Sequence, residues 1–145
     1  MILFRSPSSR SVSLGLAVLR IAAGTVFLNH GYQKLFVFGF AGVTGAFTHM
    51  GVPLPGVMGP LIGVLEVFGS IALIFGFLTR PLALAFVCDM LGAIFLVQIK
   101  NGFSHFELEF MLLGSSVALF LTGAGRFSID ALIARRGEPM TTGPA

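Results

Sequence analysis

Three ionisable side chains lie deep inside stretches that are otherwise apolar and long enough to cross a membrane. Glu66, Arg20 and Asp89 each interrupt one such stretch. At about 1.5 Å of rise per residue, each lies roughly 12–13 Å from the end of its stretch, near the middle of a hydrocarbon layer about 30 Å thick. A charge at that depth costs at least about 2.5–3.5 kcal/mol, so each side chain is expected to face a partner or a wet cavity.

Arg20 and Asp89 have equal estimated depths if their two stretches enter the membrane from the same side. The sequence therefore predicts a structural ion pair between them, in preference to a free catalytic aspartate. Glu66 is then left without a charged partner at this level. A buried carboxyl group of this kind is suited to exchange protons.

A second polar layer is expected near the opposite end of the helices. His30 and Lys34 are four residues apart and so share one face of a helix, close to Glu107 and Glu109. The two glutamates point to nearly opposite faces, so only one can look inward, and the sequence leaves open which one pairs with Lys34. The candidates for binding a ligand or exchanging protons are Glu66, His30, Lys34 and Glu107.

These residue types suit the headgroup of a quinone-like or phenolic molecule. Quinone chemistry moves protons together with electrons, so a titratable carboxyl group beside a headgroup is what such a site needs. The chain has no GxGxxG motif, P-loop or cysteine cluster, and Cys88 is its single cysteine. We therefore expect no intrinsic cofactor, with a quinone as the one candidate, and no metal site. The sequence does not single out a catalytic residue.

Composition indicates an integral membrane protein. Of 145 residues, 55% are hydrophobic and 10% are charged, against about 25% charged residues in a typical soluble domain. The formal net charge is +3. The basic residues gather at the ends of the apolar stretches, where they set membrane topology, so no nucleic-acid partner is expected.

The expected architecture is an all-α, four-helix transmembrane bundle, with spans at about 12–36, 57–79, 81–99 and 106–123. Residues 37–56 are too broken by glycine and proline for a span, and a short interfacial helix is predicted at Phe40–His49. Residues 1–11 and 131–145 are expected as cytoplasmic tails around a membrane domain at 12–130, with a short amphipathic surface helix around Ser128–Arg135.

Orientation follows from the arginines and lysines. Six arginines fall on one side of this arrangement, and Lys34 and Lys100 fall on the other. Both termini are therefore expected in the cytoplasm.

Several phrases of the sequence, in this order and spacing, resemble the DoxX family. They are His30–Phe36, Gly51–Pro53, the Glu66 span ending in Gly76–Arg80, Glu107, and Gly123–Asp130. The similarity covers roughly residues 14–133. It implies a small four-helix protein of the bacterial inner membrane, associated with oxidoreductase systems but without an agreed set of catalytic residues.

Three functions are weighed. An accessory or anchor subunit of an oxidoreductase system is favoured over a self-sufficient enzyme, with a soluble or membrane oxidoreductase as its partner. A quinone- or phenol-binding redox or detoxification component acting on its own is the close alternative. A small-molecule transporter ranks last, because no inverted repeat is visible. The small residues along the spans suit packing within one bundle or between two copies, so a homo-oligomer stays open.

Overall fold

The computed structural model describes residues 8–136, and within this range the chain is entirely helical, without strands. In addition to α-helices it contains three π-helical segments (η2, η3 and η4) and two short 3₁₀ turns (η5 and η6). The elements are α1 (Ser9–Tyr32), η2 (Gln33–Phe38), α2 (Gly39–His49), α3 (Pro55–Val64), η3 (Leu65–Gly69), α4 (Ser70–Phe75), α5 (Thr79–Gly92), η4 (Ala93–Gln98), η5 (Ile99–Asn101), η6 (Phe103–His105), α6 (Glu107–Thr122) and α7 (Ile129–Arg136).

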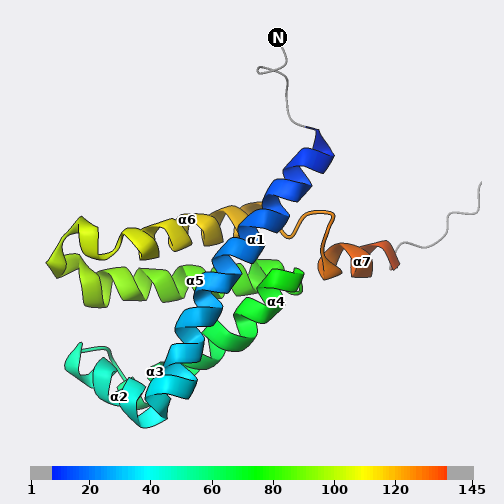
Figure 1. The fold of residues 1–145 in the computed structure, drawn as a ribbon. Coiled ribbons are helices and arrows are strands. Elements are labelled where there is room, and N and C mark those ends of the chain that lie inside the picture. Colours follow the sequence, from blue (N-terminus) through cyan, green and yellow to red (C-terminus); the bar gives the residue numbers. More distant parts are fainter. Residues whose placement is uncertain (1–7, 137–145) are drawn as a thin grey trace, which may run out of the picture.

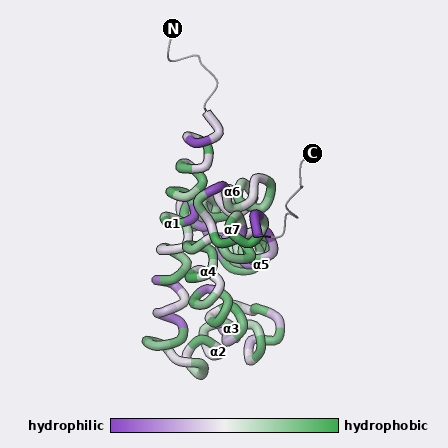
Figure 2. Tube along the Cα trace, turned by 90° about the vertical axis from the view of Figure 1, so that its right-hand side faces the viewer, coloured by the Kyte–Doolittle hydropathy of each residue, from purple (hydrophilic) through white to green (hydrophobic). Residues whose placement is uncertain are grey.

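Three runs of consecutive helical residues are long and apolar enough to cross a membrane. They cover Ser9–His49, Pro55–Phe75 and Thr79–Asn101. The fourth predicted span corresponds to α6, which has 16 residues, just below the usual minimum of about 17 for a spanning helix. Hydrophobic residues cover most of the helical length, while the first turn of α1 and part of α7 are hydrophilic (Figure 2).

The helices form two antiparallel pairs that cross each other. The rod made of α3, η3 and α4 runs back along α1, and α6 runs back along α5 (Figure 1). The chain turns at Gly39, whose φ is +67°, so that α2 folds back against α3. This confirms a helix at the position predicted for residues 40–49. Helix α1 starts at Ser9, where Ser8 caps it, three residues before the predicted start of the first span.

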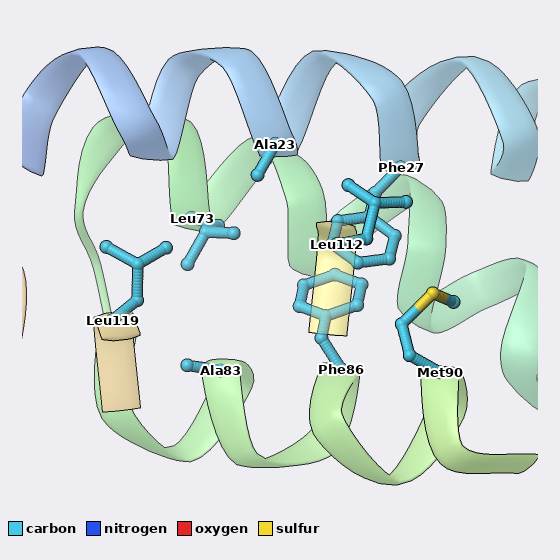
Figure 3. Packing of buried hydrophobic residues seen from close by; sticks show 8 residues of the cluster. All are labelled: Ala23, Phe27, Leu73, Ala83, Phe86, Met90, Leu112 and Leu119. Atoms are coloured by element: carbon cyan, nitrogen blue, oxygen red, sulfur yellow. The ribbon is translucent and has the colours of Figure 1, made fainter. Parts of the chain in front are cut away.

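An apolar core joins the two pairs. The rings of Phe27 and Phe86 stack with their centroids 4.0 Å apart, connecting α1 to α5. Around them lie buried side chains from α1, α4, α5 and α6 (Figure 3). The members of this core are Ala23, Phe27, Leu73, Ala83, Phe86, Met90, Leu112 and Leu119.

Glycines allow α1 to approach its antiparallel neighbour closely. A Cβ added to Gly31 would lie 2.7 Å from the Cβ of Glu66 and 2.7 Å from the backbone nitrogen of Val67. A Cβ added to Gly24 would lie 3.2 Å from the carbonyl oxygen of Ser70. The two backbones are therefore in direct contact at these points, as small-residue seams permit. This contact fixes the level at which Glu66 faces α1.

The segment after α6 returns to the end of the molecule where α4 finishes and α5 begins. The carboxylate of Asp130 accepts hydrogen bonds from the backbone N–H groups of Leu78 (2.8 Å) and Thr79 (2.9 Å), so it caps the N-terminus of α5. The N–H of Asp130 donates in turn to the carbonyl of Gly76 at 2.9 Å. The helix predicted around Ser128–Arg135 is confirmed as α7, and residues 137–145 of the predicted tail lie outside the described range.

Asp130→Ala is expected to lower the free energy of unfolding by about 1–2 kcal/mol, because a helix loses its capping carboxylate. Thermal unfolding in detergent, followed by circular dichroism, measures the change. Asp130→Asn keeps one side-chain oxygen and should lose less. Equal stability of wild type and Asp130→Ala would show that this cap contributes nothing.

Candidate functional site

A cavity of about 450 Å³ lies between the two helix pairs. Its walls are mainly apolar and come from α1, the end of α2, α3, α5 and α6, together with the three π-helical segments. Polar side chains from all of the long helices reach it. They are His30, Lys34, Glu66, Asp89, Gln98 and Glu109. Volumes of about 300–1,000 Å³ with mostly apolar walls and a few polar groups are typical of small-molecule sites.

Lys34 and Glu66 form the central contact of this site. The Nζ of Lys34 donates to Oε2 of Glu66 at 2.5 Å, the one ion pair within residues 8–136. The Glu66 side chain is 1% exposed and that of Lys34 is 24% exposed. Lys34 was expected to pair with Glu107 or Glu109, and that prediction is wrong. The antiparallel packing of Gly31 against Glu66 brings Lys34, one turn further along α1, to the carboxylate.

Asp89 lies on the opposite wall, in α5, with its carboxyl group near that of Glu66. Its Oδ2 is buried without a hydrogen-bond partner. His30 lies one turn before Lys34 on α1, lines the cavity and is near Glu66. With Lys34 protonated and both Glu66 and Asp89 ionised, the formal charges of the three side chains sum to −1. One proton shared by the two carboxyl groups makes this cluster neutral.

The polar layer is completed by Glu109 rather than by Glu107. Glu109 is half-buried, and Oε1 accepts a hydrogen bond from Nε2 of Gln98 at 3.2 Å. Glu107 is exposed and does not line the cavity. The helical spacing explains the difference, because Glu109 is three residues before Leu112, which begins the buried face of α6. This spacing is visible in the sequence. Gln98, a lone amide at the end of an apolar run, was missed.

The predicted ion pair between Arg20 and Asp89 is wrong. Arg20 is 2% exposed, and its Nη2 donates to the carbonyl oxygen of Phe127 at 2.6 Å. Its guanidinium occupies the space beside Gly76, which has φ +70°, where any Cβ would collide with it. Arg20 therefore lies at the end of the molecule where Asp130 caps α5, and not beside Asp89.

The error comes from treating equal residue counts from the starts of two apolar stretches as equal positions along the bundle. The estimate counted depth from the first apolar residues of the chain, whereas α1 starts at Ser9 and its first turns extend beyond the core (Figure 1). Arg20 consequently lies level with the turn that precedes α5. Asp89 is ten residues after Thr79, about 15 Å further along its helix.

A π-helical segment lies in each of the three long runs at the level of the cavity. Lys34 is in η2, Glu66 is in η3 and Gln98 is in η4. A π-helical turn changes the direction in which the following side chains point, and such turns are frequent at functional sites. These π-helical segments were not predicted from the sequence.

The arrangement can donate and accept hydrogen bonds inside an apolar chamber. Lys34, His30 and Gln98 supply donors, and Glu66, Asp89 and Glu109 supply acceptors or bound protons. Cys88, the free cysteine, also borders the cavity. Within the described residues, no group of three or more His, Cys, Asp or Glu side chains is arranged to hold a metal ion.

A chain that is all-helical over residues 8–136, with three runs long and apolar enough to cross a membrane, is an integral membrane protein of the multi-pass class. Its sequence matches the DoxX family model over residues 15–99. The chain therefore belongs to the DoxX family. No solved structure matches it significantly.

Relatives from three bacteria cover most of the chain. "Putative oxidoreductase CatD" of Bacillus subtilis (strain 168) is 31% identical over 127 residues, which is 86% of this chain and 91% of that protein. Inner membrane protein YqjF of Escherichia coli (strain K12) is 35% identical over 127 residues, covering 85% and 95%. Membrane protein Rv3486 of Mycobacterium tuberculosis (strain ATCC 25618 / H37Rv) is 30% identical over 132 residues, covering 81% and 80%. The predicted location in the bacterial inner membrane is confirmed.

Proposed function

We propose that this chain binds a quinone-like or phenolic molecule in the cavity between its helix pairs, as a membrane component of an oxidoreductase system. The observation that carries the proposal is the buried Lys34–Glu66 ion pair in the wall of a mostly apolar cavity of about 450 Å³. Apolar walls suit a ring and its lipid-soluble tail. The ion pair and Asp89 suit an oxygen atom that gains or loses a proton.

The polar groups match both oxidation states of such a ligand. A quinone oxygen needs donors, which Lys34, His30 and Gln98 provide. The hydroxyl of a hydroquinone or phenol needs an acceptor, which Glu66 or Asp89 provides. Glu66 is our candidate for exchanging the proton. The described residues do not supply an electron carrier to this proposal, so the electrons would pass between the bound molecule and a partner protein.

We further infer four spans with both termini in the cytoplasm. α6 runs antiparallel to α5 and would complete the bundle as a short fourth span (Figure 1). Arg10, Arg126 and Arg135 gather at one end of the molecule, and Lys34 belongs to the other. The excess of basic residues marks the cytoplasmic side.

The role in the oxidoreductase system is that of an accessory or anchor subunit. The name of the Bacillus subtilis relative includes the word oxidoreductase, which supports this class of system. The alternative is a component that binds and processes the ligand on its own. A soluble oxidoreductase that copurifies in a one-to-one ratio would support the accessory role, and a ligand-loaded protein that is active alone would support the alternative.

Glu66→Gln is expected to reduce the amount of bound quinone at least about tenfold, because a charged hydrogen bond contributes about 1.5–3 kcal/mol. Wild type and variant are purified in mild detergent from bacterial membranes. Bound small molecules are then extracted and quantified by mass spectrometry. Glu107→Gln is the matched control, because it removes the same charge from an exposed residue outside the cavity.

Gly92→Leu tests the cavity without touching its charges. Gly92 lines the cavity, and a Cβ added there meets no atom within 4 Å. The leucine should occupy ligand space, so quinone should be lost while thermal stability is kept. If wild type and Glu107→Gln carry no quinone even when it is supplied in excess, the proposed function is wrong. Equal loading of wild type and Gly92→Leu would place the ligand elsewhere.

A further inference from the structure

A second hollow, of about 610 Å³, lies at the opposite end of the molecule from the Lys34–Glu66 pair. Three arginines from three separate elements converge on it. Arg10 comes from the first turn of α1, Arg126 from the loop after α6, and Arg135 from the last turn of α7. All three are exposed. Their convergence depends on the docking of the C-terminal segment, so it is not apparent from the sequence spacing.

The positive charge of this hollow is not opposed from within it. No acidic side chain is among the described residues that line it. Between Gly123 and Arg136, the acidic residue is Asp130, and both of its carboxylate oxygens accept hydrogen bonds from the N–H groups of Leu78 and Thr79. The hollow is therefore suited to an anion. Arginine binds phosphate oxygens through two parallel N–H donors.

Apolar side chains adjoin the arginines. Phe127 and Leu132 line the hollow and are 48% and 56% exposed. Ile133, on α7 as well, is 55% exposed. An amphipathic helix with exposed apolar residues and basic residues at its end lies in the interface between a bilayer and water. The anionic part of a ligand here would contact the arginines, and its apolar part would contact Phe127 and Leu132.

We propose that this hollow, which we call the arginine hollow (Arg10, Arg126, Phe127, Ser128, Leu132 and Arg135), binds the phosphate headgroup of an anionic phospholipid from the surrounding bilayer. The arginines hold the phosphate, and Phe127 and Leu132 contact the start of the acyl chains. Basic pockets next to membrane-spanning helices are typical sites for anionic lipids. Because Arg126 and Phe127 follow one another, a bound headgroup also steadies the carbonyl that accepts from Arg20.

The test compares two double variants with the same loss of charge. Arg126→Gln/Arg135→Gln removes two arginines of the hollow, and Arg80→Gln/Arg136→Gln removes two exposed arginines that do not line it. The full chain is delipidated in detergent and titrated with phosphatidylglycerol or phosphatidylcholine, and bound lipid is counted by native mass spectrometry. We expect phosphatidylglycerol to bind wild type and the control equally. Binding to the hollow variant should be roughly 25-fold weaker, at about fivefold for each arginine.

Three results would overturn the proposal. Equal weakening in both double variants would mean that overall charge, not this hollow, attracts the lipid. Equal binding of phosphatidylcholine would remove the role of the anionic headgroup. Displacement of the lipid by millimolar inorganic phosphate would make this a site for free phosphate. If the double variant folds poorly, Arg135→Gln against its neighbour Arg136→Gln gives the same comparison.

Discussion

Lys34→Met is expected to lower the free energy of unfolding by about 3–5 kcal/mol, because it leaves the carboxylate of Glu66 buried without its partner. Glu66 is 1% exposed, so water cannot solvate its carboxylate once the lysine charge is removed. The nearby carboxyl group of Asp89 adds repulsion when both groups are ionised. The measurement is unfolding in mixtures of detergent and sodium dodecyl sulfate, followed by circular dichroism. Lys100→Met removes an exposed lysine and should change stability little.

The double variant Lys34→Met/Glu66→Met distinguishes a role of the ion pair in ligand binding from a role in stability. Replacing both charged partners by apolar residues is often neutral for stability, so the double variant should regain most of the stability lost by Lys34→Met. A stable double variant that binds no quinone would show that the pair is retained for ligand binding. If Lys34→Met is as stable as wild type, the pair in this structure does not hold the fold together.

Much of the architecture could be predicted from the sequence, because apolar length and the positions of glycine and proline determine where helices start and stop. Residues 37–56 were correctly predicted to contain a short helix, since Gly39 and Gly51 interrupt the apolar run with positive φ angles. Glu66, His30 and Lys34 were singled out because ionisable residues in apolar stretches must find partners, but they were placed in two separate layers, Glu66 near the middle and the other two near one end. The structure instead brings all three to one cavity.

The pairing of these residues could not be predicted from depth alone. Depth estimates depend on where each helix enters the membrane, and α1 already packs against the core at Leu16 and Leu19, before Arg20. The positions of Lys34 and Glu66 relative to each other depend on Gly31, where the two helix backbones are in contact, and on the π-helical turns in η2 and η3. Both are products of packing between segments far apart in the chain.

Gly31→Ala is expected to destabilise the protein by about 1–3 kcal/mol or more, because overpacking a close contact forces the backbones to move apart. The added Cβ would lie 2.7 Å from the backbone nitrogen of Val67 and 2.8 Å from the carbonyl carbon of Glu66. A flexible side chain could turn aside, but these are backbone atoms. Moving them apart also moves Glu66 away from Lys34, so quinone binding should fall together with stability.

Gly15→Ala is the matched control in the same helix, since a Cβ at Gly15 meets nothing within 4 Å. Alanine favours a helix over glycine by about 1 kcal/mol, so this control should be unchanged or slightly more stable. Unfolding in detergent and quinone content are measured for both variants. If Gly31→Ala is as stable as Gly15→Ala, α1 does not pack closely against Glu66. The geometry proposed for the site would then be wrong. If Gly31→Ala loses stability and bound quinone while Gly15→Ala keeps both, the backbone contact at Gly31 is required for the site. The same glycine positions the carboxylate of Glu66 and permits the helices to pack.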